Sequence, residues 1–242
     1  MAPAELVAFG THPDDVELGC GATLAAFVAS GGSAVIVDLT GGERASRGSA
    51  ATRWQEAQAA AAVLGVPRYC LKLPDTGLQA CSARQRRAVV ALLRQLRPAF
   101  LLIPHPADPH PDHREASLLL QGVAFLAAVK GFAPEVGEPH RPQLILAYPG
   151  PRQLGEPPLV VEVTASYARK LDALACYGSQ FAPSAGPPTH LASGYFLPAV
   201  EGRDRAYGNL IGAERGEGFF PLSPINASAL RGFLARVVCA SA

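Results

Sequence analysis

Two runs near the N-terminus indicate the fold class: Leu6-Val7-Ala8-Phe9 and Ala34-Val35-Ile36-Val37-Asp38-Leu39. Both runs are short and almost wholly apolar, which is typical of strands buried on both faces of a parallel sheet. Between them, residues 21–30 predict a helix that ends at Gly31-Gly32. A strand, a helix and a second strand in succession predict an α/β fold with parallel strands.

The same alternation continues along the chain. The patterns predict helices at 51–64, 82–97, 114–129 and 165–177, and strands at 69–73, 100–103, 143–148 and 159–163. We therefore expect a single Rossmann-like, doubly wound domain over residues 1–242 with a mainly parallel sheet. Residues 1–130 would form its core, and residues 131–158, rich in Pro and Gly, would cross the surface. The chain from about residue 179 is expected to be irregular, and it would cover substrate or contact another copy.

Composition narrows the class of protein. The 242 residues are 49% hydrophobic and 17% charged, which argues against disorder. The net charge is +1, and a cluster at Arg84, Arg86 and Arg87 is expected to be a solvated helix face, so nucleic acid is not an expected partner. No signal peptide or membrane span is predicted, and five cysteines without a C-x-x-C pair argue against a disulfide framework. These features indicate a soluble, cytoplasmic protein.

Two histidine motifs carry the chemistry. His12-Pro13-Asp14-Asp15 follows the first strand, and His110-Pro111-Asp112-His113 follows the strand at 100–103. Ligands of doubly wound sheets bind beyond the carboxyl ends of the strands, near the point where the strand order reverses. We therefore expect both motifs to meet in one site at that edge of the sheet.

The residue types in these motifs suit a catalytic metal. A hydrolytic metal needs a few protein ligands and one open position. His12 and Asp15 can be aimed at one ion by a tight turn, with His113 as the third ligand. Asp14 then lies beside the metal as a general base. His110, held by Asp112, can donate a hydrogen bond to a substrate oxygen.

Two other interpretations stay open at this point. Pro13 and an aspartate could simply form a turn and cap a helix, although a turn does not call for the histidines. Alternatively, the sheet could belong to a non-catalytic sugar- or nucleotide-binding module. Against that, no G-x-G-x-x-G motif follows the first strand, where Gly19-Cys20-Gly21 is only a fragment of it.

The stretch from Phe9 to Gly19 and the motif at 110–113 resemble the two signature motifs of the PIG-L / LmbE-like deacetylases. That family consists of metal-dependent enzymes, mostly zinc enzymes, that remove the acetyl group from N-acetylglucosamine-containing substrates. Further segments resemble the bacillithiol-biosynthesis branch: Asp38-Leu39-Thr40, Arg53 with Glu56-Ala57, Pro74-Asp75-x-Gly77-Leu78, Tyr177-x-Ser179-Gln180-Phe181, Gly194-Tyr195 and Ala213-Glu214-x-x-Glu217-x-Phe219.

This resemblance implies His12, Asp15 and His113 as metal ligands, Asp14 as general base, and His110 with Asp112 as the group that stabilises the oxyanion or protonates the amine. It implies that Tyr195 polarises the substrate carbonyl and that Arg53 and Gln180 face substrate. Glu43 and Arg44 follow the second strand and are further candidates for substrate contact.

The implied substrate is N-acetylglucosaminyl-malate, with the mycothiol precursor, N-acetylglucosamine or a chito-oligomer as alternatives. Zinc is the implied metal, ferrous iron is the alternative, and a homo-oligomer, often a hexamer, is the implied assembly. The sequence departs from the family pattern at His105, at Pro109 and in the stretch 184–190, which is expected to border the aglycone.

Overall fold

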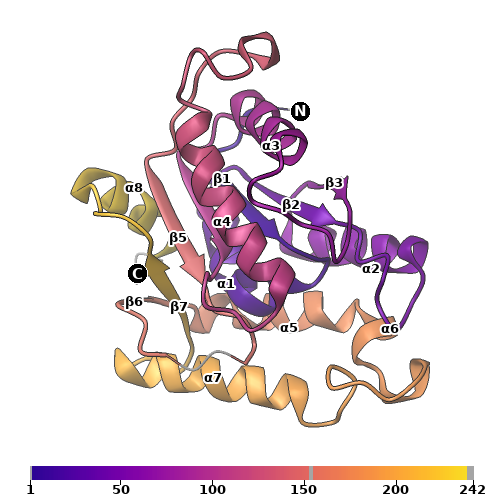
Figure 1. The fold of residues 1–242 in the computed structure, drawn as a ribbon. Coiled ribbons are helices and arrows are strands. Elements are labelled where there is room, and N and C mark those ends of the chain that lie inside the picture. The colour runs from indigo at the N-terminus through magenta and orange to yellow at the C-terminus, as the bar shows by residue number, and fades with distance from the viewer. Residues whose placement is uncertain (1, 153–154, 239–242) are drawn as a thin grey trace.

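The computed structural model describes residues 2–152 and 155–238, and its centre is a seven-stranded sheet (Figure 1). The strands are β1 (Leu6–Gly10), β2 (Ala34–Thr40), β3 (Arg68–Leu73), β4 (Phe100–Pro104), β5 (Leu144–Tyr148), β6 (Leu159–Glu162) and β7 (Gly216–Pro221). The α-helices are α1 (Asp15–Ala29), α2 (Ala50–Leu64), α3 (Ala83–Leu96), α4 (Pro111–Leu126), α5 (Tyr167–Ala175), α6 (Gly178–Phe181), α7 (Phe196–Leu210) and α8 (Ala227–Val237).

The sheet has the strand order β3-β2-β1-β4-β5-β7-β6. The first five strands of that order pair in parallel, whereas β7 is antiparallel to both β5 and β6. The predicted α/β class and the mainly parallel sheet are confirmed. The strand order reverses between β1 and β4, so the crevice that suits a ligand lies at the carboxyl ends of these two strands.

Two hydrophobic cores hold the layers together, one on each face of the sheet. Alternate residues of β1 point to opposite faces, so Val7 and Phe9 pack with α3 and α4, while Leu6 and Ala8 pack with α1, α2, α5 and α8. Figure 1 shows α3 and α4 in front of the sheet and α1 behind it. Burial on both faces explains why β1 and β2 read as continuous apolar runs.

The first helix begins six residues earlier than the predicted start at residue 21, at Asp15, and it is kinked at Cys20. The prediction missed this turn because Gly19 and Gly21 flank the kink and both weaken a helical pattern. Helix α4 also begins before the predicted residue 114, since Pro111 takes the first helical position and His110 caps it. Both helices therefore start inside the histidine motifs.

The expectation of an irregular chain from about residue 179 is wrong. That region contains α7, β7 and α8, besides short turns. Pro198, Gly202 and Gly208 weaken the helical pattern of α7. The sequence of β7, GEGFFP, carries two glycines and a proline and resembles a loop, so only packing against β5 and β6 reveals it as a strand.

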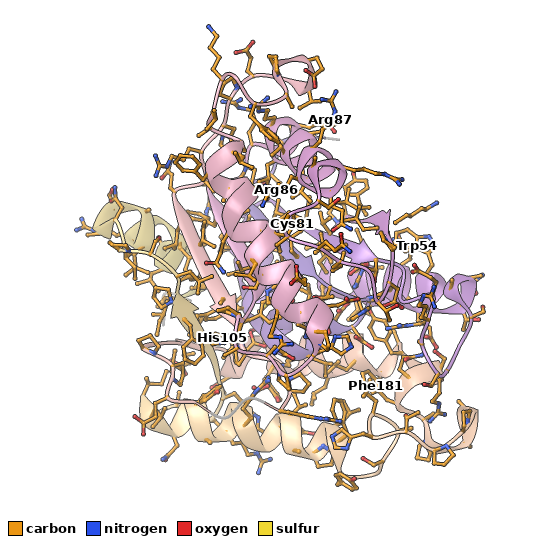
Figure 2. All side chains as sticks on the ribbon, in the orientation of Figure 1. Trp54, Cys81, Arg86, Arg87, His105 and Phe181 are labelled. Atoms are coloured by element: carbon orange, nitrogen blue, oxygen red, sulfur yellow. The ribbon has the colours of Figure 1, made fainter. Side chains whose placement is uncertain are left out.

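The arginine cluster lies on α3, where Arg84 and Arg87 are exposed. Figure 2 labels Arg86 and Arg87 of this cluster. Arg87 pairs with Glu135, as expected of a solvated face. Among the described cysteines, Cys20, Cys70, Cys81 and Cys176 are free thiols, and Cys239 lies outside the described residues. Within residues 2–152 and 155–238, no helix is long and apolar enough to cross a bilayer.

Candidate metal centre

The two histidine motifs meet at the carboxyl ends of β1 and β4. His12 lies in the turn between β1 and α1, and its backbone N–H donates to Asp15 Oδ2 at 2.8 Å. His113 lies in the first turn of α4, which follows β4 after the loop at 105–110. Two turns about a hundred residues apart in sequence thus form one site, because their strands are neighbours in the sheet.

Three side chains converge with the spacing of a metal site. His113 Nε2 lies 3.4 Å from both His12 Nδ1 and Asp15 Oδ2, and the last two atoms are 3.7 Å apart. Ligand atoms about 2.1 Å from a zinc ion at tetrahedral angles lie about 3.4 Å from each other. The donor set of two imidazoles and one carboxylate therefore fits a divalent metal and leaves a fourth position open.

Each of the two histidines is backed by a carboxylate. His12 Nε2 lies 3.0 Å from Asp75 Oδ1, and His113 Nδ1 lies 3.2 Å from Asp108 Oδ2. The contact with His12 lowers the pKa of Asp75 to about 2, so this carboxylate is ionised. A carboxylate on the far nitrogen fixes the tautomer of a histidine and leaves its other nitrogen free to ligate.

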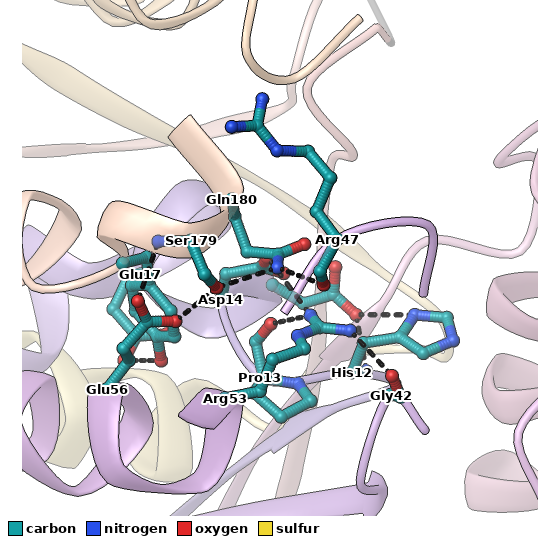
Figure 3. Close-up of polar contacts among 12 residues, drawn as sticks. His12, Pro13, Asp14, Glu17, Gly42, Arg47, Arg53, Glu56, Ser179 and Gln180 are labelled. Carbon is teal, nitrogen blue, oxygen red and sulfur yellow. Dashed lines mark hydrogen bonds and ion pairs between the residues drawn. The ribbon is translucent and has the colours of Figure 1, made fainter. Parts of the chain in front are cut away.

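Asp14 sits beside the three donors in a strained backbone conformation. Its φ of 103° and ψ of −25° lie outside the regions that non-glycine residues favour. Arg53 holds this turn: its Nη2 donates to Pro13 O at 2.7 Å and lies 3.3 Å from Asp14 Oδ2 (Figure 3). Burial raises the pKa of Asp14 to about 7, although the Arg53 guanidinium opposes that shift. A carboxyl of this pKa can both accept and return a proton near neutral pH.

His110 caps α4 and lines the cleft beside Asp14. Its Nδ1 accepts the backbone N–H of Asp112 at 3.2 Å, so the neutral ring carries its proton on Nε2. Burial lowers the pKa of His110, and the neighbouring His113 and His12 lower it further, which favours this neutral form. The ring is therefore a hydrogen-bond donor at neutral pH.

The role expected of Asp112 takes a different form in the structure. Its backbone N–H, rather than its carboxylate, meets His110. The carboxylate accepts the N–H of Thr76 at 2.6 Å and lies 3.9 Å from His12 Nε2. Asp112 is the second residue of a helix capped by His110, and in this geometry the cap side chain bonds the backbone N–H.

The donors open into a cleft of about 540 Å³, a volume within the range of small-ligand sites. Arg44, Arg53 and Gln180, which were expected to contact substrate, line this cleft. The Arg53 guanidinium is buried and bonded to Pro13, Asp14 and Gly42, so it also fixes the turn. Gln180 Nε2 donates to Arg47 O at 2.8 Å.

Two other expected residues, Tyr195 and Glu43, are not brought to the cleft, and neither is His105. Tyr195 is 64% exposed at the start of α7, and its ring contacts His190. Glu43 binds backbone N–H groups of Asp75 and Gly41. His105 packs against the ring of Phe220 at 4.6 Å, at the position that Figure 2 labels. In the described part of the chain, the cleft lining includes none of these three side chains.

Sequence reasoning missed three residues of the site: Asp75, Asp108 and Arg47. Asp75 and Asp108 follow strands β3 and β4, which was the available signal, since carboxyl strand ends gather at one edge. Arg47 lies in the Gly-rich loop after β2 and lines the cleft. It is 4% exposed, and its Nε and Nη1 are buried without a hydrogen-bond partner among the described residues.

Comparisons with known proteins agree with this site. Residues 7–123 match the family model PIG-L: GlcNAc-PI de-N-acetylase. The diacetylchitobiose deacetylase of Thermococcus kodakarensis is 34% identical over 126 residues, which are 47% of each chain. The aligned region thus spans about half the length of this curated relative. Residues 7–123, which carry both histidine motifs, thus match the PIG-L family.

Two solved structures resemble nearly the whole chain. The conserved protein TT1542 from Thermus thermophilus is 35% identical with a TM-score of 0.82, and the match covers 92% of this chain and 96% of that one. The N,N'-diacetylchitobiose deacetylase from Pyrococcus horikoshii is 25% identical with a TM-score of 0.78, covering 94% and 89%. The likeness therefore extends beyond residue 123 to the C-terminal half.

Proposed function

We propose that this chain is a metal-dependent deacetylase that hydrolyses the acetamide of an N-acetylglucosamine conjugate. The observation that carries the proposal is the trio of donor atoms in His12, Asp15 and His113, 3.4–3.7 Å apart, with the carboxyl of Asp14 beside it. The family match of residues 7–123 supports the same chemistry. Zinc is the proposed metal, and ferrous iron suits the same donors.

The chemistry divides between the metal and the protein. A divalent metal in this site would supply Lewis acidity, lowering the pKa of a water and polarising the acetyl carbonyl. Asp14, whose pKa is raised by burial, accepts the proton of the water that attacks the carbonyl carbon. The Nε2–H of His110 donates to the oxygen on which negative charge develops. The C–N bond then breaks, and the proton held by Asp14 passes to the amine, which leaves acetate and a free glucosamine.

In the observed conformation, Tyr195 takes no part in this reaction scheme. Its side chain is 64% exposed and contacts His190 rather than the cleft. The role implied by the family resemblance requires the segment around His190 and Tyr195 to close over a bound substrate.

We propose N-acetylglucosaminyl-malate as the substrate, because the cleft offers cationic groups to an acidic aglycone. Arg44, Arg47 and Arg152 line it in addition to Arg53. The guanidinium of Arg47 extends away from His12 (Figure 3). Its Nη2 donates to Ala182 O at 2.5 Å, and its buried Nε and Nη1 have no hydrogen-bond partner within the described residues. Guanidinium groups form charge-assisted hydrogen bonds with carboxylates, so a malate carboxylate suits these cationic side chains.

Deacetylation of diacetylchitobiose is the second candidate. It is favoured by the relatives from Thermococcus kodakarensis and Pyrococcus horikoshii, which are diacetylchitobiose deacetylases. That substrate has no carboxylate, so the two candidates differ in what they require of Arg47.

Acetate release from both conjugates and from N-acetylglucosamine, by metal-loaded and by chelated protein, tests the proposal. The expected result is chelator-sensitive release, fastest from the malate conjugate, with a selective loss for that conjugate in Arg47→Met. Faster release from diacetylchitobiose, unaffected by that substitution, would keep the chemistry and replace the substrate. No release from any of the three by metal-loaded protein would contradict the proposed function.

A further inference from the structure

Helix α1, which carries Asp15, is broken after its first turn. Cys20 has φ −151° and ψ 21°, far from helical values. In an unbroken helix, the N–H groups of Ala22 and Thr23 would donate to the carbonyls four residues earlier, on Leu18 and Gly19. The break therefore leaves backbone donors and acceptors inside a buried part of the molecule, where they need other partners.

Glu217 of β7 satisfies the donors. Its two carboxylate oxygens accept the N–H of Ala22 at 3.2 Å and the N–H of Thr23 at 2.7 Å. Glu217 is fully buried, so these are strong, charge-assisted hydrogen bonds shielded from bulk solvent. The second part of α1 is thus capped by a residue nearly two hundred positions later in the sequence.

Arg203 of α7 satisfies an acceptor on the other side of the break. Its Nη2 donates to Leu18 O at 2.7 Å, and its Nη1 lies 3.3 Å from Gly150 O. Arg203 also binds Asp204, whose other oxygen accepts from Lys170 at 2.7 Å. Lys170 donates to Glu217 at 2.7 Å as well, which closes a network of two cations and two anions with balanced charge.

The broken turn packs closely against the end of β5. A Cβ atom on Gly19 would lie 2.1 Å from the Tyr148 ring, so the backbone there is in direct contact with that ring. Tyr148 in turn donates its hydroxyl to Phe9 O at 2.6 Å, at the end of β1. The turn that carries Asp14 and Asp15 is therefore held between Tyr148 on one side and the partners of the break on the other.

Stability alone is a poor reason for this network. Burying four charged groups costs desolvation free energy, and apolar residues of similar volume often stabilise a protein equally well or better. Here the charged groups meet the backbone atoms that the break sets free, which apolar side chains cannot do. This placement indicates that the network fixes a geometry.

We propose that Arg203 and Glu217 are positioning residues for the metal-bearing turn, residues 11–19. They act through the backbone of α1 on either side of Cys20, and through it they fix Asp15 as a ligand and Asp14 beside it. Both lie beyond residue 123, so the part of the chain outside the family match would complete the metal site. The inference rests on the proposed function only in taking His12, Asp15 and His113 as the metal site.

Zinc affinity of the full-length protein, measured by competition with a chromophoric chelator, tests this inference. Arg203→Lys and Glu217→Gln should each weaken zinc binding by about tenfold or more, the effect expected when a support of a ligand is lost. Arg94→Lys is the matched control. Arg94 is 4% exposed and donates to the carbonyls of Ala127, Val129, Ala133 and Gly137, so it also supports a backbone turn, but away from the metal site.

Hydrogen exchange adds a measurement on the unaltered protein. The amides of Ala22 and Thr23 should exchange as slowly as those of β1 in wild type, and faster in the two variants with the change confined to α1. Fast exchange of these amides in wild type would overturn the inference even where the variants fail to fold.

The outcomes separate the inference from the proposed function. Wild type that binds no zinc would contradict the proposed function itself. Tight wild-type binding that both variants retain would overturn the positioning role. A loss of affinity in all three variants, in proportion to their lost stability, would also overturn it, because general destabilisation would then explain the result.

Discussion

The carboxylate behind His113 offers a sharp test of how the site is held. Asp108 Oδ2 lies 3.2 Å from His113 Nδ1, while Asp108 Oδ1 accepts the backbone N–H of His110 at 2.8 Å. In Asp108→Asn, the remaining oxygen can still accept from His110, so the loop keeps its shape. The new amide group faces His113 Nδ1 as a donor, however. It favours the tautomer with the proton on Nε2, which is the atom that must ligate.

The size of the effect follows from the bond that is lost. A hydrogen bond to a charged group contributes about 1.5–3 kcal/mol, and 1.4 kcal/mol corresponds to about a tenfold change in affinity. We therefore expect zinc to bind roughly 10–100-fold more weakly to the variant, in agreement with the usual effect of removing such a carboxylate.

Competition with a chromophoric chelator at fixed pH measures this loss. Glu115→Gln is the control, since Glu115 lies on α4, the helix that carries His113. Its carboxylate accepts the N–H of Ala80 at 2.6 Å, outside the cleft lining of the described residues. It should leave zinc affinity unchanged. Equal dissociation constants for Asp108→Asn and wild type would show that Asp108 does not support His113 as a ligand.

Two further predictions concern pH and packing. Burial opposes protonation of His113, but the carboxylates of Asp15 and Asp108 raise its pKa to about 9 in the metal-free protein. Metal binding must displace this proton, so zinc affinity should rise with pH up to about 9, which chelator competition at several pH values checks. Because the pKa of His113 is raised in the folded state, protonation of His113 stabilises the metal-free protein fully below about pH 6.5, and this contribution disappears by about pH 9. Urea titrations of metal-free protein should therefore show the free energy of unfolding falling by up to about 3 kcal/mol across this range. A free energy of unfolding that does not change with pH would contradict the prediction. Gly19→Ala should lower the free energy of unfolding by roughly 1–3 kcal/mol, since the new Cβ would lie 2.1 Å from the Tyr148 ring. Gly122→Ala should raise the free energy of unfolding slightly, because Gly122 lies in α4 with open space around it. Equal effects of the two substitutions in urea titrations would contradict close packing of Gly19 against Tyr148.

The sequence was sufficient to predict the parts of the fold and of the site that depend on short segments of the chain. The apolar runs of β1 and β2 are buried on both faces, so their pattern alone identifies a parallel sheet. His12 and His113 follow neighbouring strands, and the rule that ligands gather at carboxyl strand ends was enough to place them together.

The remaining parts depend on contacts between distant residues. Nothing near Asp108 in sequence announces that its carboxylate meets His113, and the carboxylate of Asp112 meets Thr76 because of how α4 begins. Strand β7 exists because β5 and β6 pair with it, although its glycines disfavour a strand. Glu217 belongs to a segment that resembles the family, but its contact with α1 could not be predicted from the sequence. That contact depends on the break at Cys20, which frees the N–H of Thr23 to donate to Glu217.

Turnover by Asp14→Asn, with metal content measured on the same preparation, tests whether Asp14 is the general base of a metal-dependent hydrolysis. Asparagine preserves the shape of Asp14 but cannot accept the proton of the attacking water. Acetate release from the best substrate of the metal-loaded wild type should fall by about 10²–10⁴-fold, while the bound metal stays at the wild-type level. Wild-type turnover in this variant would contradict the account, because the proton would then have another acceptor.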